Sequence, residues 1–324
     1  MSTRDPSLTG SISIVIPVFN GAATIGPLVD QLTAHYGDLP ELEIILVNDG
    51  SSDGSAATCR ELVGRYPGSV RFLDLSRNFG EHQAILAGLN RSSGDAVVIM
   101  EDDFQSSPED VGKLIETLHA GSHDVVYGQF EVMHYSWLRR LASRLNDRMA
   151  TLLLGKPRDL YLSSFKCLSR FLVDEVCRYQ GPFPYLDGLI LRVTRNIGVV
   201  ACEHRPRSEG SSGYTIRKLL ALWLNMFTNF SILPLRLAVV AGFGFAFLGG
   251  LLSIGVVIEK IWLPNWIPHT ASGWPSTIII VMTFAGLQLM VLGMIGEYLG
   301  RVFLSSNRTP QFAVREEHGF DEPR

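Results

Sequence analysis

Several features that would mark a common protein class are missing from this sequence. It has only four cysteines, without C-x-x-C spacing or a metal-site pattern: Cys59, Cys167, Cys177 and Cys202. We therefore expect reduced, mostly buried thiols of a cytosolic domain. The net charge of −4 over 324 residues gives no reason to expect nucleic acid as a partner. Residues 1–6 are polar and lack an apolar h-region, so no signal peptide is predicted.

Charged residues are absent from two long runs in the last third of the chain, residues 237–258 and 270–296. About 20 apolar residues are enough to cross the hydrocarbon core of a bilayer. We therefore predict a two-helix transmembrane hairpin within residues 232–304, with helices at about 235–259 and 273–298 and a short external loop. A pair of buried core helices is the alternative interpretation.

Basic residues flank this predicted hairpin and are nearly absent from its loop, which holds only Lys260. The flanking residues are Arg217, Lys218 and Arg236 before it, and Arg301 and Arg308 after it. By the positive-inside rule, both termini and the domain before the hairpin are expected in the cytoplasm, at an inner or plasma membrane.

Residues 215–231 have apolar side chains at helical spacing. The apolar stripe consists of Ile216, Leu219, Leu220, Trp223, Met226, Phe227 and Phe230. This pattern predicts an amphipathic helix lying in the membrane interface. A helix docked on the soluble domain has the same pattern, and only the position before an apolar run favours the membrane.

Strand-like and helix-like patterns alternate within residues 11–214. Strands are predicted at 12–18, 43–47, 70–75, 96–100 and 124–127, and helices at 24–36, 56–66, 81–90 and 109–119. This alternation predicts an α/β domain with a doubly wound, mostly parallel sheet. Residues 1–10 are expected to be disordered, as is the end of the tail 305–324 from about Arg315.

Three carboxylates, Glu101, Asp102 and Asp103, directly follow the apolar strand at 96–100, and Gln105 comes next. The carboxyl ends of parallel strands are where open α/β sheets bind ligands. Adjacent acids repel one another without a cation, and Mg²⁺ uses one or two carboxylates together with substrate phosphates. We therefore predict a metal–diphosphate site. A solvated acidic turn before the helix at Glu109 is the alternative.

Polar residues also follow the first two predicted strands. Residues 17–20 read Pro-Val-Phe-Asn, and residues 48–54 read Asn-Asp-Gly-Ser-Ser-Asp-Gly. Each segment alone is ordinary turn and helix-cap chemistry. Together with residues 101–105, they are expected to place polar groups at three positions along one sheet edge.

These motifs, in this order, resemble the family-2 glycosyltransferases of GT-A fold. The matching segments are 14–20, 48–53, 77–80 and 101–105, with Ala84 and Gly88. The carboxyl half is similar to the polyprenyl-phosphate glycosyltransferases, which include dolichyl-phosphate mannose synthases, bacterial glucosyltransferases and aminoarabinose transferases. That likeness rests on residues 207–214, the two apolar runs and residues 296–301, so the whole resemblance covers residues 12–312.

The resemblance implies a role for each matching residue. The donor nucleotide would be held by Pro17, Phe19, Asn20, Asp49, Ser51 and Asp102. Mg²⁺ or Mn²⁺ would be bound, with the donor diphosphate, by Glu101, Asp103 and Gln105. A loop closing over the diphosphate would contain Arg207, Gly210, Ser212 and Tyr214. The acceptor phosphate would be held by Arg139 or Arg140.

The sequence departs from the family pattern at three places. Glu101 stands where relatives usually have Asp, and Asp102 offers a substitute. Gly213 stands where relatives often have Lys, so one cation for the diphosphate is missing. Residues 128–133 lack the Arg that often follows the strand, so the acceptor site must depend on the next helix.

That next helix, predicted over residues 137–154, carries a basic ridge formed by Arg140, Arg144 and Arg148 at intervals of four residues. A solvated charged face is the preferred interpretation for Arg148. For Arg139, Arg140 and Arg144, an anionic lipid head group or the acceptor phosphate fits better because a membrane is expected nearby.

The implied activity is metal-dependent, inverting transfer of a sugar from a nucleoside diphosphate to undecaprenyl or dolichyl phosphate, for glycan or lipopolysaccharide modification. Asp103, Arg207 and Asp187 are the candidate catalytic residues. Since a phosphate's second pKa is about 6, the acceptor needs no general base, and a structural turn acid is the preferred interpretation of Asp187. Family members sometimes form tetramers through their membrane helices.

Two other functions are alternatives to this one. A processive polysaccharide synthase would need more spans and a Gln-x-x-Arg-Trp motif, neither of which is present. A catalytically degenerate, membrane-anchored scaffold that binds nucleotide sugars draws support from Glu101 and Gly213. The residues that speak against it are the intact Asp49, Asp103, Gln105 and Arg207.

Overall fold

The structure is a computed structural model. It describes residues 10–39, 41–130, 151, 156–157, 160–181, 184–202, 239–240, 242–245, 247, 251, 258, 274–307 and 310–320. The chain divides into two compact units. One consists of residues 1–215 and 308–324, and the other of residues 216–307.

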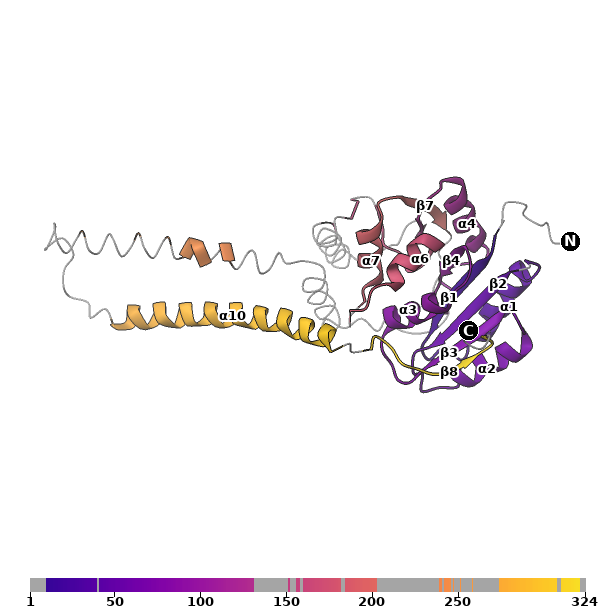
Figure 1. The fold of residues 1–324 in the computed structure, drawn as a ribbon, viewed down its shortest axis with the longest axis horizontal. Helices are drawn as coiled ribbons and strands as arrows, with labels where there is room; N and C mark the ends of the chain where they lie inside the picture. Colours follow the sequence, from indigo (N-terminus) through magenta and orange to yellow (C-terminus); the bar gives the residue numbers. More distant parts are fainter. Residues whose placement is uncertain are drawn as a thin grey trace. The chain divides into compact units, whose positions relative to one another are not determined.

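An eight-stranded sheet forms the centre of the first unit (Figure 1). Its strands are β1 (Ile12–Val18), β2 (Leu42–Asn48), β3 (Val70–Leu75), β4 (Ala96–Ile99), β5 (Val125–Phe130), β6 (Lys166–Ser169), β7 (Ile197–Cys202) and β8 (Val314–His318). They lie in the order β7-β5-β6-β4-β1-β2-β3-β8. Strands β6 and β8 run antiparallel to their neighbours, whereas the other described pairs are parallel. The prediction of a mostly parallel α/β sheet is confirmed.

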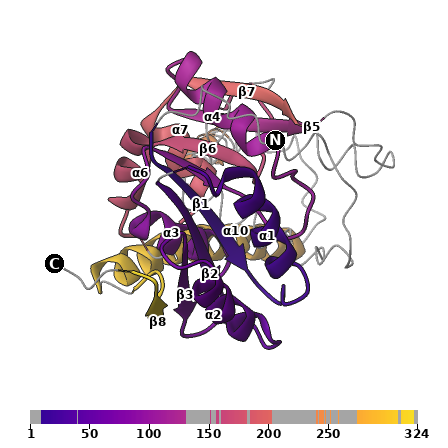
Figure 2. The same cartoon turned by 90° about the vertical axis from the view of Figure 1, so that its right-hand side faces the viewer.

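Helices cover both faces of this sheet. They are α1 (Ile25–Tyr36), α2 (Ser55–Arg65), α3 (Glu81–Arg91), α4 (Asp110–Ala120), α6 (Arg170–Cys177) and α7 (Leu186–Val193). Figure 2 shows α1, α2 and α4 on one face and α3, α6 and α7 on the other. Strand β1 is buried along its whole length, which is why its sequence is continuously apolar rather than alternating.

The elements between residues 12 and 130 agree with the sequence-based prediction. All five strands and four helices are present, with ends shifted by at most three residues. Strands β6 and β7 and helices α6 and α7 were not predicted. The four cysteines are free thiols, and Cys59, Cys167 and Cys202 are buried, as expected.

The expectation of disorder from Arg315 onward is wrong for residues 314–318. They form β8, which pairs antiparallel with β3 at the edge of the sheet. Glu316 forms an ion pair of 3.0 Å with Arg60, and Glu317 one of 2.6 Å with Arg91. The charged composition suggested a solvated tail, but charged side chains are also typical of an edge strand with one face in water.

The second unit contains α10 (Trp274–Ser306), which at 1.5 Å per residue is about 50 Å long. Its stretch Phe284–Ser306 is long and apolar enough to cross a membrane, the one such helix in the described part of the chain. Large apolar side chains along it are exposed, including Leu289 at 70% and Leu299 at 65%. Most of the other predicted span, 235–259, lies outside the described residues, as does the predicted interfacial helix 215–231.

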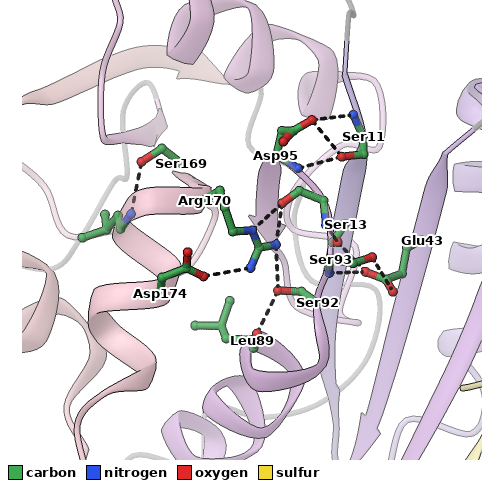
Figure 3. Close-up of polar contacts among 12 residues, drawn as sticks. Ser11, Ser13, Glu43, Leu89, Ser92, Ser93, Asp95, Ser169, Arg170 and Asp174 are labelled. Atoms are coloured by element: carbon green, nitrogen blue, oxygen red, sulfur yellow. Dashed lines mark hydrogen bonds and ion pairs between the residues drawn. The ribbon is translucent and has the colours of Figure 1, made fainter. Parts of the chain in front are cut away.

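A polar network holds the amino-terminal edge of the sheet together (Figure 3). Glu43 on β2 is buried, accepts hydrogen bonds from the Ser13 hydroxyl and the Ser93 backbone N–H, and forms an ion pair with Arg71. The Arg170 guanidinium on α6 donates to the Gly94 carbonyl oxygen at 2.8 Å. Neighbouring strands and α6 are thereby joined at the turn before β4.

Replacing Glu43 by glutamine should destabilise the fold by about 2 kcal/mol. Breaking a fully buried ion pair costs about 3–5 kcal/mol, and the effect is smaller here because the Arg71 side chain is 24% exposed. The measurement is thermal unfolding of purified protein in detergent. Glu41→Gln is the matched control, since Glu41 is exposed two residues earlier and should stay within about 0.5 kcal/mol of wild type. Equal stability of the two variants would contradict the prediction.

Candidate active site

The polar segments predicted to form a site follow β1, β2 and β4, which are parallel neighbours. Their carboxyl ends therefore meet at one edge of the sheet, opposite the Glu43 network. The strands that follow β1 in sequence, β2 and β3, lie on one side of it, whereas β4 lies on its other side, so the strand order reverses between β1 and β4. Such a reversal is where open α/β sheets bind ligands.

The loops after β1 and β2 are joined by hydrogen bonds. The Asn20 backbone N–H donates to the Ser51 hydroxyl at 3.0 Å, and the Asn20 side-chain oxygen accepts from the Ser52 backbone N–H at 2.9 Å. Asn20 adopts a left-handed backbone conformation, with φ of 55°, which costs energy for any residue with a Cβ. The predicted donor residues Asn20 and Ser51 are thus together, beside Phe19, whose ring is 54% exposed.

Asp49 is buried at the end of β2 and ties a third loop to this edge. One of its oxygens accepts from the Phe79 backbone N–H at 2.7 Å, and the other from that of Gly80 at 2.9 Å. Burial raises the pKa of the Asp49 carboxyl, and these two hydrogen bonds act against that rise. At Gly50 the backbone has φ of +64°, and a Cβ there would lie 2.4 Å from the Asn78 backbone nitrogen. Glycine is therefore required where the two loops meet.

The acidic segment after β4 closes the same edge. Glu101, Asp102, Asp103 and Gln105 are all partly buried. The Asp102 carboxylate packs directly on Gly21, where a Cβ would lie 1.8 Å from Asp102 Oδ2. Within the segment, the Gln105 backbone N–H donates to Asp103 Oδ1 at 3.0 Å. The four loops of this edge therefore form one contiguous surface of carboxylate, amide and hydroxyl groups.

This surface suits a divalent cation that shares its ligands with a substrate. No group of three His, Cys, Asp or Glu side chains placed to hold a metal occurs in the described ranges. Two carboxylates and an amide oxygen on one short loop are nevertheless the hard ligands that Mg²⁺ or Mn²⁺ prefers, and such ions commonly complete their coordination with phosphate oxygens. Glu101, Asp103 and Gln105 fit that arrangement.

Asp187, for which a structural turn acid was the preferred interpretation, lies at the start of a helix. It lies in the first turn of α7, is buried, and forms an ion pair with Lys166 on β6. The Tyr127 hydroxyl on β5 donates to the same oxygen, Asp187 Oδ1, at 3.0 Å. Burial and the Asp187 charge raise the pKa of Tyr127 well above its usual value, so the hydroxyl stays protonated as a donor. We call these three residues the Lys166 cluster.

His82 links the Lys166 cluster to the loop that Asp49 holds. It lies in the first turn of α3, as expected for residues 81–82, and its ring meets the Tyr185 ring edge-on at 5.2 Å. Its Nδ1 atom is buried and has no hydrogen-bond partner among the residues that the structure describes. Burial lowers the pKa of His82, while the charges of Glu81 and Asp187 act in the opposite direction and that of Lys166 adds to the lowering.

The lowered pKa of His82 predicts that acid weakens the fold. Because the unfolded chain binds this proton more readily than the folded one, stability present above pH 6.5 is lost as the pH falls below that value. We expect the melting temperature of wild type to fall more steeply between pH 7 and pH 5 than that of His82→Phe, which keeps a ring against Tyr185. Parallel pH curves for the two proteins would show that His82 does not carry the effect.

The other predicted site residues lie outside the described residues. They are Arg139, Arg140 and Arg144 of the acceptor helix, and Arg207, Gly210, Ser212, Gly213 and Tyr214 of the predicted closing loop. Their roles remain predictions. Lys166 and Tyr127 were not predicted, because a lysine and a tyrosine within short strands carry no spacing signal.

Comparison with known proteins bears on this geometry. Residues 13–175 match the family model described as glycosyl transferase family 2. The chain is 32% identical over 317 residues to the undecaprenyl-phosphate 4-deoxy-4-formamido-L-arabinose transferase of Proteus mirabilis, covering 96% of this chain and 95% of that protein. Its Serratia proteamaculans counterpart is 33% identical over 314 residues, covering 95% and 94%.

Solved structures share the fold. The glucosyl-3-phosphoglycerate synthase of Mycobacterium tuberculosis, crystallised with Mn²⁺, uridine diphosphate and phosphoglyceric acid, is similar with a TM-score of 0.52 at 21% identity. The match covers 68% of this chain and 76% of that one. The same enzyme with Mn²⁺, UDP-glucose and phosphoglyceric acid also gives a TM-score of 0.52.

Proposed function

Because this chain belongs to glycosyl transferase family 2, we propose that it transfers a sugar from a nucleoside-diphosphate donor to undecaprenyl phosphate at the cytoplasmic face of a membrane. The observation that carries this proposal is the meeting of the Asp49, Gly21 and Glu101–Gln105 loops at one sheet edge. Relatives that match nearly the whole chain, including its apolar segments, are named as transferases to that lipid phosphate.

The nucleotide-sugar donor would be bound by the residues gathered at this sheet edge. Pro17, Phe19, Asn20, Asp49, Ser51 and Asp102 would hold the nucleotide. The exposed Phe19 ring offers a stacking face for a base. Glu101, Asp103 and Gln105 would hold Mg²⁺ or Mn²⁺, and the fold relatives crystallised with Mn²⁺ support a divalent ion. Such an ion neutralises charge that develops on the leaving diphosphate.

The acceptor side needs positioning more than proton transfer. An undecaprenyl phosphate oxygen is already ionised near neutral pH, so it can attack without a general base. Arg139, Arg140 and Arg144 would hold that phosphate, and Arg207 would contact the diphosphate when residues 210–214 close. Attack from the face opposite the diphosphate inverts the anomeric carbon. Holding donor and acceptor in line supplies much of the rate enhancement in such reactions.

The membrane part of the proposal is a hairpin, with α10 as its second helix. Residues 308–324 belong to the same unit as residues 1–215, and β8 pairs within its sheet. Both ends of the segment 216–307 are therefore on the same side of any membrane that α10 crosses. An even number of crossings is then required, which supports a first helix at about 235–259. Assembly into a homo-oligomer through these helices belongs to the same proposal.

The sugar of the relatives is the first candidate for this chain. An identity of about one third leaves the sugar pocket free to differ, so the donor is tested as a panel headed by UDP-4-deoxy-4-formamido-L-arabinose. Full-length protein in nanodiscs is incubated with undecaprenyl phosphate, Mn²⁺ and each donor. The expected product is the lipid heavier by one sugar, seen by mass spectrometry together with released nucleoside diphosphate.

A scaffold that binds nucleotide sugars without turnover is the competing function, and the same assay separates the two. Binding of a donor with no glycolipid from any member of the panel would favour the scaffold. A product carrying several sugars on one acceptor would instead favour a processive synthase.

A further inference from the structure

The Lys166 cluster lies beside the donor side of the candidate active site. Lys166 pairs with Ile99 in the β4–β6 ladder, two residues before Glu101. On its other side, α7 begins next to Tyr185, whose ring contacts His82, and His82 lies two residues beyond the Gly80 N–H that binds Asp49. The cluster is thus connected, through neighbouring residues, to the loop that contains Glu101 and to the loop that Asp49 binds. Both loops belong to the proposed donor site.

The cluster is costly to build. The side chains of Lys166 and Asp187 are only 4% and 10% exposed, and removing two charges from water costs several kcal/mol per ion. An apolar pair of similar volume would stabilise a fold at least as well. A purely structural role therefore gives no reason for a charged pair at this position.

The described contacts of the Asp187 carboxylate involve its Oδ1 atom and not its Oδ2 atom. Both partners of Asp187, the Lys166 ammonium and the Tyr127 hydroxyl, contact Oδ1, and no other hydrogen bond to this carboxylate occurs within the described ranges. The Lys166 ammonium also lies 5.1 Å from the centre of the Tyr127 ring. The carboxylate is thereby held in one orientation, with Oδ2 available to accept a hydrogen bond.

We propose that Lys166 is a positioning residue: together with Tyr127 it orients Asp187 so that Oδ2 accepts a hydrogen bond from a hydroxyl group of the sugar being transferred. The lysine also offsets a negative charge that would otherwise repel a donor diphosphate and an acceptor phosphate. This inference rests on the proposed function, because it assigns part of the sugar subsite of that reaction.

Two ligands that differ only in the sugar test the inference. Binding of UDP and of UDP-4-deoxy-4-formamido-L-arabinose is measured by calorimetry on full-length protein in nanodiscs with Mn²⁺, next to thermal unfolding. The variants are Lys166→Met, Lys166→Arg and the double variant Lys166→Met/Asp187→Asn. The double variant removes both charges, so it keeps a foldable protein if the single Lys166→Met leaves Asp187 buried without its cation and unfolds.

The expected result is a loss confined to the sugar. The double variant should melt close to wild type and bind UDP within about twofold, but bind the UDP-sugar about tenfold more weakly, because a hydrogen bond to a charged acceptor becomes one to a neutral acceptor. Lys166→Arg, which keeps a cation, should retain most of the preference for the UDP-sugar.

Four results would overturn the inference, three of them in the variants and one in wild type. In the first, the double variant binds the UDP-sugar like wild type. In the second, it loses UDP and the UDP-sugar equally. In the third, donor binding is unchanged while kcat falls and its pH profile shifts, which is the behaviour of a general base. If wild type itself prefers neither ligand, there is no sugar contact for Lys166 to support. The proposed function is judged separately, by the glycolipid product.

Discussion

Asp103→Asn should lose sugar transfer by about a thousandfold while keeping its fold. A metal ion that neutralises a leaving diphosphate contributes several kcal/mol, and each 1.36 kcal/mol corresponds to a factor of ten in rate. Asparagine keeps the size of the side chain and an acceptor for the Gln105 backbone N–H, which Asp103 Oδ1 binds at 3.0 Å. The change therefore removes the charge that would hold the cation and little else. The measurement is the initial rate of glycolipid formation at saturating donor.

Glu109→Gln is the matched control for this variant. Glu109 is an exposed acid in the same connection, four residues beyond Gln105, so losing its charge should leave the rate near wild type. Titration with Mn²⁺ adds a second measure, because the Asp103 variant should need far more ion for any activity it retains. Wild-type rates in Asp103→Asn at low Mn²⁺ would exclude the assigned metal site.

Deleting residues 310–324 should strongly destabilise the catalytic domain. The truncation removes β8 and with it four cross-strand pairs to β3, from Phe72↔His318 to Leu75↔Val314. At roughly 0.2–1 kcal/mol per pair, with the ion pairs to Arg60 and Arg91 also lost, a total near 3 kcal/mol is expected. For a domain of this size that lowers the melting temperature by about 6–12 °C.

The same truncation uncovers the edge of β3, so aggregation on heating should begin earlier as well. Removing only residues 321–324 is the control, because it leaves β8 and its ion pairs in place. A truncation at 310 that melts together with this control would show that β8 contributes nothing measurable to the domain.

The first half of the domain was predictable because its elements follow simple periodic patterns. β1 and β2 are apolar along their whole length, and α1 to α4 follow at the spacing of a parallel sheet. β6 was missed because it is four residues long, begins with a lysine and runs into α6 without a turn. β8 was missed because its partner, β3, is more than 200 residues away in sequence. No local sequence pattern indicates a strand pairing between such distant segments.

The candidate site was predictable to a similar extent and for the same reason. Residues at the ends of parallel strands meet at one edge, so Asn20, Asp49 and Glu101–Gln105 could be grouped from the sequence. The buried partners of Asp187 could not, because an ion pair between β6 and α7 depends on packing rather than on spacing. The hydrogen bonds from the Phe79 and Gly80 backbone N–H groups to Asp49 could not be predicted either, because every residue except proline carries such a donor.

The place of β8 in the chain also sets an order of events during synthesis. A ribosome completes residues 12–202, which hold seven of the eight strands, before it begins the segment 216–307, and β8 emerges last. Until then the outer edge of β3 is an open template for chaperones or for other nascent chains. The sheet can close only when the apolar segment has already left the ribosome. The last step in folding this domain, the pairing of β8 with β3, therefore follows synthesis of the whole segment 216–307.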